Sequence, residues 1–349
     1  MHGATTASIK QKTERWSIED VNDLIGRDLP STNPVIDSGI LPERSVAVVG
    51  GVSKLGKSLF AVNMGLCIAT GTPFLLQFNV PKRRRVVYLQ GEISLASLQD
   101  RLRKMKNGGP WPEQGWFWQI TKKGLRLNLD RDLAALSETL GRVSPEVLIL
   151  DPLYKFHSLD ENKAGDMTRL FSNLDRLIVD HNLALVIVHH HGKPVDGRPE
   201  GSHQLRGSSA IADYGDTYLT LNRKSGKEPR SYLKLSFELR NDEDPDPLFL
   251  YRDPQSLWYE VLGEDSQGAV GIHDVVEALR NLGGRARRAD LIRAVADRTG
   301  RSDKTAQRAI QKTHAVKKIV SQELKTQGRP VEYYLPGQGD FFPYEDKGH

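Results

Sequence analysis

Apolar runs and amphipathic stretches alternate along the first half of the chain, after a polar lead-in. Mostly apolar runs typical of strands lie at residues 45–50, 85–90, 116–120, 146–151 and 183–190. Between these runs, apolar residues recur at helical spacing in residues 58–69, 95–105, 132–142 and 166–181. Strands that alternate with helices predict βαβ units on a parallel sheet.

Two of these runs, residues 147–150 and 183–188, are apolar at every position, which predicts strands buried on both faces. Residues 191–206 form a long loop rich in glycine, proline and basic side chains. After this loop, antiparallel strands are expected at residues 217–222, 232–239, 248–252 and 257–261. The pattern therefore predicts an α/β fold whose mostly parallel sheet is extended by antiparallel strands.

The C-terminal part of the chain has a different pattern. Helices are expected at residues 272–281, 288–298 and 303–314, and short strands at 317–323 and 331–335. Ser302 is a suitable N-cap for the third helix. Three helices followed by a hairpin are typical of the winged-helix form of helix-turn-helix, in which the third helix contacts DNA. Lys304, Arg308 and Lys312 would then be the DNA-binding side chains. The alternative is that this module contacts another protein.

The changes in pattern predict five parts of the chain. These parts are an N-terminal extension (1–40), an α/β domain (41–262), a linker (263–271), a winged-helix domain (272–336) and a tail (337–349).

Composition narrows the class of protein. Hydrophobic residues make up 38% of the 349 residues, which is sufficient for a buried core. The single cysteine, Cys67, excludes an intramolecular disulfide framework and a cysteine-rich zinc site. No apolar run is long enough for a membrane span, and the first thirty residues contain no signal-peptide pattern. We therefore expect a soluble, cytoplasmic protein with no membrane partner.

Positive charge is concentrated near the C-terminus. Residues 270–336 contain 14 lysines and arginines against 7 acidic residues, a net charge of +7, whereas the whole chain has +5. The rest of the chain is therefore close to neutral. A basic module of this kind indicates a nucleic-acid partner.

One motif indicates a nucleotide. The segment Gly51-Val-Ser-Lys-Leu-Gly56-Lys57-Ser58 matches the phosphate-binding loop G-x-x-x-x-G-K-[ST], and it stands between an expected strand and an expected helix. In such loops the backbone N–H groups surround the phosphates, the lysine reaches the β- and γ-phosphates, and the serine contacts Mg²⁺. We expect ATP and Mg²⁺ to bind here. The expected contact residues are Gly51, Val52, Ser53, Lys54, Leu55, Gly56, Lys57, Ser58 and Leu59.

Two carboxylates complete the predicted site. Asp151 ends a buried strand, where it would hold Mg²⁺ together with Ser58. The next residue is Pro152, so the residue that activates water must lie elsewhere. Glu92, at the end of the strand after the loop helix, is the candidate base. The alternative for Glu92 is an ordinary surface glutamate.

Over residues 30–260, these motifs resemble the plasmid RepA-type hexameric helicases, a family of RecA-like P-loop ATPases. The resemblance rests on GVSKLGKS, VVYLQGE with Glu92, LILDPLYKFH with Asp151, LVIVHHHGK, and QLRGSSAIADYGD. It implies a RecA-like ATPase domain over residues 41–262. The C-terminal winged helix departs from the smaller members of that family.

The resemblance also implies further site residues. A histidine after the strand that follows Asp151 would sense the γ-phosphate, and both His189 and His190 fall on that position. His189–His191 as a metal site is the alternative. In that family a basic residue of one subunit reaches the nucleotide of its neighbour, and Arg206 or Arg240 would do so here. Alternatively, Arg206 caps the following helix and Arg240 is a solvated charge.

The loop after His190 falls where RecA-like proteins contact DNA. Lys193, Arg198 and His203 are its candidate DNA-binding residues, and a solvated lid is the alternative reading. We expect a Mg²⁺-dependent, DNA-stimulated ATPase that forms a homo-oligomeric ring, with a hexamer as the family form. It would act as a helicase in plasmid or mobile-element replication. The alternatives are an ATP-switched DNA-binding regulator or loader, and a recombination or repair accessory ATPase.

Overall fold

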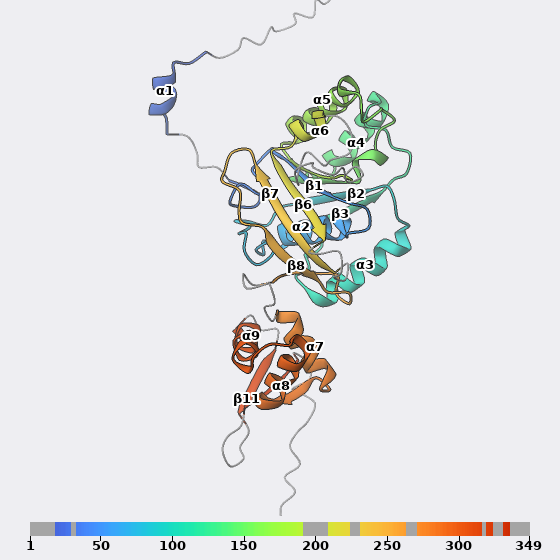
Figure 1. Ribbon diagram of the computed structural model, residues 1–349. Helices are drawn as coiled ribbons and strands as arrows, with labels where there is room; N and C mark the ends of the chain where they lie inside the picture. The colour runs from blue at the N-terminus through green and yellow to red at the C-terminus, as the bar shows by residue number, and fades with distance from the viewer. Residues whose placement is uncertain are drawn as a thin grey trace, which may run out of the picture. The chain divides into compact units, whose positions relative to one another are not determined.

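A computed structural model describes residues 18–28, 33–190, 209–223, 231–262, 271–315, 319–323 and 331–335 (Figure 1). The elements of its largest part follow one another as β1 (Val46–Gly51), α2 (Lys57–Thr70), β2 (Val86–Gln90), α3 (Leu95–Gly108), β3 (Phe117–Thr121), α4 (Asp130–Gly141), β4 (Val147–Asp151), the 3-10 helix η1 (Leu153–Lys155), α5 (Ala164–His181), β5 (Ala184–Val188), α6 (Ser209–Tyr214), β6 (Thr217–Arg223), β7 (Tyr232–Leu239), β8 (Leu248–Arg252) and β9 (Tyr259–Leu262).

Over the described residues, these strands form one sheet in the order β3-β2-β4-β5-β1-β6-β7-β8-β9. Pairing is parallel from β3 to β6 and antiparallel from β6 to β9. The predicted α/β class, a mostly parallel sheet extended by antiparallel strands, is therefore confirmed. The carboxyl ends of β1, β2 and β4 lie at the same edge of the sheet, and Gln90 pairs with Asp151 there.

Helices cover the parallel strands on both faces (Figure 1). Strand β1 alternates between two hydrophobic clusters, as a strand buried on both faces must. Ala47 and Val49 pack with α2 and α3 in the first cluster, and Val46 and Val48 pack with α4 and α5 in the second. The core therefore consists of three layers, with the sheet in the middle. Burial on both sides holds the strand ends that carry the site in fixed positions.

Two segments are more buried than their composition indicates. Val35, Ile36, Ile40 and Leu41 follow the polar lead-in, yet they belong to the first hydrophobic cluster. Arg84 lies in the basic run at residues 82–85 but is only 4% exposed. Its guanidinium donates to the carbonyls of Asn33 and Pro34 and forms an ion pair with Glu146 at 3.3 Å. These contacts fix residues 33 and 34 against the residues that precede β2 and β4.

The N-terminal unit, Met1–Thr32, is separate from the rest of the chain. Its described part contains helix α1 (Val21–Gly26), which begins at the N-cap Asp20 and buries no residue. Among the residues that the structure describes, no helix is both long and apolar enough to cross a bilayer.

Residues 271–335, here called the C-terminal module, contain α7 (Ile272–Asn281), β10 (Arg285–Arg287), α8 (Arg288–Thr299), α9 (Asp303–Ala315), β11 (Val320–Glu323) and β12 (Val331–Tyr334). Its strands form an antiparallel sheet in the order β10-β12-β11. The module has a hydrophobic cluster of its own, which includes Val275, Leu291, Ile310 and Tyr333. The sequence predicts these helices and the β11–β12 hairpin but not the three-residue strand β10. The winged-helix assignment and the five-part division of the chain stay predictions.

Candidate active site

The phosphate-binding loop joins β1 to α2 and depends on two glycines. Gly51 has a φ of +147°, and a Cβ there would lie 2.5 Å from the carbonyl oxygen of Leu221. Gly56 has a φ of +97°, and a Cβ there would collide with Arg252 and the hydroxyl group of Tyr259. Both positions therefore require glycine. The loop ends at the N-terminus of α2, where free backbone N–H groups favour an anion.

Lys57 is the first residue of α2 and is 4% exposed. Its ammonium group donates to the carbonyl oxygens of Gly51 at 2.8 Å and Val52 at 2.9 Å, and to Nδ1 of His190 at 3.1 Å. Burial lowers the pKa of Lys57 to about 8, although the carboxylates of Asp151 and Glu92 act in the opposite direction. The ammonium group is thus held at the mouth of the loop in a partly desolvated position.

Asp151, at the end of β4, is 3% exposed and meets Ser58 of α2. The Ser58 hydroxyl donates to Oδ1 at 3.0 Å, and the Tyr88 hydroxyl donates to Oδ2. Burial raises the pKa of Asp151, and these hydrogen bonds oppose the rise. A buried carboxylate beside a hydroxyl offers the oxygen ligands that Mg²⁺ prefers together with nucleotide phosphates. The residues present therefore fit the predicted Mg²⁺.

Glu92 follows β2, and its backbone is fixed by the side chain of Gln90. Oε1 of Gln90 accepts from the N–H groups of Glu92 and Ile93, both at 3.0 Å, and its amide nitrogen donates to Oγ1 of Thr121 at 2.8 Å. The Glu92 carboxylate accepts a hydrogen bond from the Tyr154 hydroxyl. Glu92 is exposed and lines the same cavity as Lys57 and Asp151.

This cavity, the nucleotide pocket, has a volume of about 530 Å³. Of the predicted loop residues, its lining includes Ser53, Lys54, Gly56, Lys57, Ser58 and Leu59, while Gly51, Val52 and Leu55 contribute backbone carbonyls to the contacts around it. The structure thus brings the phosphate-binding loop, Asp151 and Glu92 together around one space.

The two candidate histidines face different surroundings. His190 lines the nucleotide pocket and accepts from Lys57, and burial followed by the Lys57 charge lowers the pKa of His190 to about 4. It is therefore neutral at pH 7, with its proton on Nε2. His189 is 1% exposed, and its Nδ1 lies 3.9 Å from Oε1 of Glu161, which is also 3.5 Å from Nε2 of His157. Of the two, His190 is the one that lines the nucleotide pocket, and the response of either histidine to the γ-phosphate stays a prediction.

A second cavity of about 560 Å³ adjoins the first and shares Ser53, Tyr154 and His190 with it. His157, Glu161 and His189 also line this second cavity. Within the described residues, no group of three or more histidine, cysteine or acidic side chains is arranged to hold a metal ion. His191, the third histidine of the alternative metal site, lies outside the described residues.

Several side chains of the nucleotide pocket were not found from the sequence. Those with a phenol or guanidinium group are Tyr88, Arg101, Tyr154 and Arg252. Arg252 of β8 donates to the carbonyl of Leu55 at 3.1 Å, and Tyr259 of β9 donates to that of Gly56 at 2.9 Å, so the antiparallel strands hold the loop. Arg101 of α3 contributes a second guanidinium. Tyr88 and Tyr154 stand in the segments VVYLQGE and LILDPLYKFH, but no motif assigns any of these four residues a role, and tertiary packing brings them to the site.

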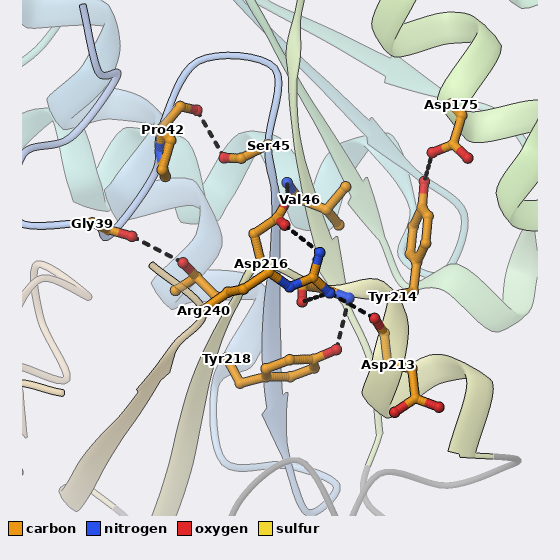
Figure 2. A network of polar contacts seen from close by, with 12 residues as sticks. Gly39, Pro42, Ser45, Val46, Asp175, Asp213, Tyr214, Asp216, Tyr218 and Arg240 are labelled. Atoms are coloured by element: carbon orange, nitrogen blue, oxygen red, sulfur yellow. Dashed lines mark hydrogen bonds and ion pairs between the residues drawn. The ribbon is translucent and has the colours of Figure 1, made fainter. Parts of the chain in front are cut away.

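Arg240 follows β7 and lies in a polar network near the start of β1 (Figure 2). Its guanidinium donates to Oδ1 of Asp216 at 2.8 Å and to the carbonyls of Asp213 at 2.7 Å and Gly215 at 3.1 Å. Oδ2 of Asp216 accepts from the N–H of Val46 at 2.9 Å. Arg240 thus ties the end of α6 to β1 at the end opposite the phosphate-binding loop. Its action on a neighbouring subunit stays a prediction.

We expect Arg240→Ala to lower the free energy of unfolding by about 1–2 kcal/mol, because two backbone carbonyls and Asp216 lose their donor while half of the arginine side chain stays solvated. Urea unfolding measures the loss. The matched control is Arg142→Ala, since Arg142 pairs with Glu138 on the surface of α4. A loss no larger than that of the control would contradict the structural role of Arg240.

The other predicted basic residues are placed as follows. Arg206, Lys193, Arg198 and His203 lie outside the described residues. Lys304 and Arg308 are exposed on α9, on the side away from the buried Ala306 and Ile310. Lys312 belongs to the same helix.

The fold and the pocket define the class of protein. A phosphate-binding loop between a central strand and a helix, with a buried aspartate and an exposed glutamate facing it, is the site of a P-loop ATPase, and the mostly parallel sheet extended by antiparallel strands gives it the RecA-like form. Residues 10–196, more than half of the chain, match the family described as AAA domain. The chain belongs to that family.

Individual relatives are distant. The DNA repair protein RadA of Listeria monocytogenes is 23% identical over 167 residues, which cover 47% of this chain and 31% of RadA. The chain therefore spans about a third of the length of that curated relative.

Comparison with solved structures gives three further matches. A KaiC-like protein from Pyrococcus horikoshii is 14% identical, with 68% of this chain and 99% of that chain covered and a TM-score of 0.44. A DnaB-like replicative helicase is 14% identical, with 70% and 67% covered and a TM-score of 0.49. The RadB recombinase is 16% identical, with 63% and 92% covered and a TM-score of 0.46.

The titration of Lys57 predicts a pH dependence of nucleotide binding. ATP is attracted by the charged ammonium group, and the ligand-free protein loses that charge as the pH rises through about 8. We expect the affinity for ATP to fall above this pH, by up to about tenfold per pH unit. Fluorescent-nucleotide titrations between pH 7 and 9.5 measure the change. Lys57→Arg, which stays charged, should show no such decline, and an equally flat profile for the parent would contradict the prediction.

Proposed function

We propose that this chain is a Mg²⁺-dependent ATPase that is stimulated by DNA and acts as a ring-forming helicase in plasmid or mobile-element replication. The observation that carries the proposal is the convergence of Lys57, Asp151 and Glu92 on one pocket at the carboxyl edge of the sheet. The resemblance to the RepA-type helicases supports the finer assignment. The name of the relative RadA, a DNA repair protein, supports a DNA partner.

Each residue has a role in hydrolysis. Ser58 and Asp151 would hold Mg²⁺, which would neutralise charge on the phosphates. Lys57 exchanges its contacts with His190 and the loop carbonyls for phosphate oxygens. Glu92 orients the attacking water and accepts its proton. Arg101, which lines the same pocket, adds positive charge from within the subunit.

The ring would complete the site. An arginine of the adjacent subunit, Arg206 or Arg240, would stabilise the charge that develops on the γ-phosphate. Lys193, Arg198 and His203 would contact single-stranded DNA inside the ring, chiefly through its phosphates, so that binding weakens with salt. Homo-oligomerisation, with a hexamer as the family form, is part of this proposal.

The second candidate function is an ATP-switched DNA-binding regulator or loader. It is favoured by the exposed polar face of α9, where the basic Lys304 and Arg308 and the neutral Gln311 are spaced at i, i+4 and i+7. The C-terminal module would then act as a winged helix on duplex DNA. A recombination or repair accessory role, as the name of RadA indicates for that relative, is the third candidate.

A strand-displacement assay separates these functions. A helicase unwinds a forked duplex only with ATP and Mg²⁺, and its ATP turnover is continuous while DNA is present. A regulator binds ATP and duplex DNA but displaces no strand and turns over slowly. Strand displacement that proceeds equally well when Mg²⁺ or ATP is left out would contradict the proposed motor function.

The α9 face carries a separate prediction. We expect Lys304→Ala and Arg308→Ala each to weaken duplex binding and to reduce the slope of log K against log salt by about 0.9, since each removes one phosphate contact. Fluorescence anisotropy at several salt concentrations measures the slope. Arg293→Ala, an exposed arginine of α8, is the control with the same net charge. Equal slopes for all three variants and the parent would exclude α9 as the contact surface.

A further inference from the structure

Tyr154 joins the predicted base to the strand that carries Asp151. It lies in η1, directly after the Asp151–Pro152 pair, and its hydroxyl donates a hydrogen bond to Oε1 of Glu92. The same side chain lines both the nucleotide pocket and the second cavity. Sequence motifs give Tyr154 no role, so its contact with Glu92 is a property of this fold.

The turns that carry Glu92 and Tyr154 are packed against each other. The N–H of Gly91 donates to the carbonyl of Asp151 at 3.1 Å. A Cβ on Gly91 would lie 3.1 Å from Cβ of Lys155 and 3.3 Å from the ring of Phe156, so these turns are in close contact. Their separation is therefore set by the backbone, and the Tyr154–Glu92 hydrogen bond is made at a fixed distance from Asp151.

The Tyr154 hydroxyl keeps its proton and can therefore always donate a hydrogen bond to Glu92. Burial, followed by the hydrogen bond to Glu92, raises the pKa of Tyr154 above its usual value, so the hydroxyl stays protonated at any working pH. The His190 ring, with its centroid 5.5 Å away and tilted by 56°, limits the movement of the tyrosine ring. A neutral donor on Oε1 leaves the second carboxylate oxygen of Glu92 available for water.

Glu92 is thus held at both ends. The Gln90 side chain fixes its backbone through the N–H groups of Glu92 and Ile93, and Tyr154 fixes one carboxylate oxygen. Glutamate has several rotamers of similar energy when it is exposed, and ordering of the base before reaction removes that entropy from the barrier.

We propose that Tyr154 is a positioning residue for Glu92. It selects the carboxylate orientation in which one oxygen is tied to Tyr154 and the other faces the γ-phosphate end of the pocket. This proposal rests on the proposed function, in which Glu92 is the base. Because Tyr154 acts through Glu92, its removal slows the chemical step and leaves ATP binding unchanged.

The test is a double-mutant cycle of Tyr154→Phe and Glu92→Gln, with ATP turnover measured at saturating Mg²⁺ and with single-turnover assays for the slow variants. Tyr154→Phe is expected to lower kcat on the order of 10- to 100-fold, with KM for ATP unchanged. In the Glu92→Gln background, the same substitution should have no further effect. Tyr214→Phe is the matched control. The Tyr214 hydroxyl also donates to a carboxylate, that of Asp175 at 2.9 Å, but Tyr214 belongs to α6 and does not line the nucleotide pocket.

The outcomes separate the two claims. If Glu92→Gln loses turnover while Tyr154→Phe turns over like the parent, the positioning role is wrong and the base assignment stands. Equal losses from Tyr154→Phe in both backgrounds would show a structural effect that does not act through Glu92, which also overturns the proposal. If Glu92→Gln keeps full turnover, the proposed base fails, and the role of Tyr154 fails with it.

Discussion

Replacement of Lys57 by alanine is expected to abolish ATP turnover, with a loss in kcat/KM on the order of 100- to 1,000-fold or more. The ammonium group is buried at the mouth of the phosphate-binding loop, and two loop carbonyls and His190 hold it there. Arg101 and Arg252 also line the pocket, but they project from α3 and β8. Neither can replace a cation that begins the loop helix.

Coupled-enzyme assays measure the turnover, and titration with a fluorescent nucleotide measures binding. Lys104→Ala is the control, because Lys104 is an exposed lysine of α3 outside the pocket. It should retain the activity of the parent. Parent-like turnover in Lys57→Ala would mean that the pocket around the loop is not where ATP is hydrolysed.

Replacement of Glu92 by glutamine is expected to lower kcat by about 10²- to 10⁴-fold while ATP still binds. Glutamine keeps the size of the side chain and its hydrogen bond with Tyr154, but it cannot accept the proton of the attacking water. Asp151 cannot take over this role, since its carboxylate is buried against Ser58 and Tyr88. The expected result is a protein that forms a stable complex with ATP and Mg²⁺.

Rapid quench of the first turnover separates loss of chemistry from loss of binding. The control is Glu113→Gln, because Glu113 is exposed and pairs with Arg83 on the surface. A decrease in ATP affinity with unchanged kcat would place Glu92 in binding and not in proton transfer.

Local patterns predicted much of this site. The phosphate-binding loop is one continuous motif, and Asp151 and Glu92 both end apolar runs that are recognisable as strands. Parallel strands bring their carboxyl ends to one edge of a sheet, so the convergence of these residues follows from the βαβ pattern. The antiparallel extension was also predicted, because its strands follow one another with short connections.

The remaining residues depend on tertiary packing. His189 and His190 are adjacent at a strand end, and adjacent side chains there face opposite sides. The sequence does not show which of the two histidines faces Lys57. In the structure it is His190 that contacts the Lys57 ammonium group. Arg84 is buried although the neighbouring Lys82 and Arg83 are exposed, because the carbonyls of Asn33 and Pro34, distant in sequence, accept hydrogen bonds from its guanidinium. Arg252 belongs to no motif, and the segment LILDPLYKFH that contains Tyr154 assigns that residue no role.

Arg240 shows a different limit of sequence reasoning. Its position after β7 is compatible with action on a neighbouring subunit, and the sequence also left a solvated charge open. In the folded chain it holds Asp216 and the end of α6 (Figure 2). Loss of turnover in Arg240→Ala with unchanged stability would favour action in trans. Loss of stability alone would favour the structural contacts.

ATP turnover by the parent protein, measured with Mg²⁺ in the presence and absence of single-stranded DNA, tests the central claim most directly. A P-loop ATPase with Glu92 as its base should hydrolyse ATP continuously, faster with DNA, and the activity should be lost in Lys57→Ala and Glu92→Gln. Tight ATP binding with negligible turnover, whether or not DNA is present, would contradict the motor function and leave the ATP-switched regulator as the better account.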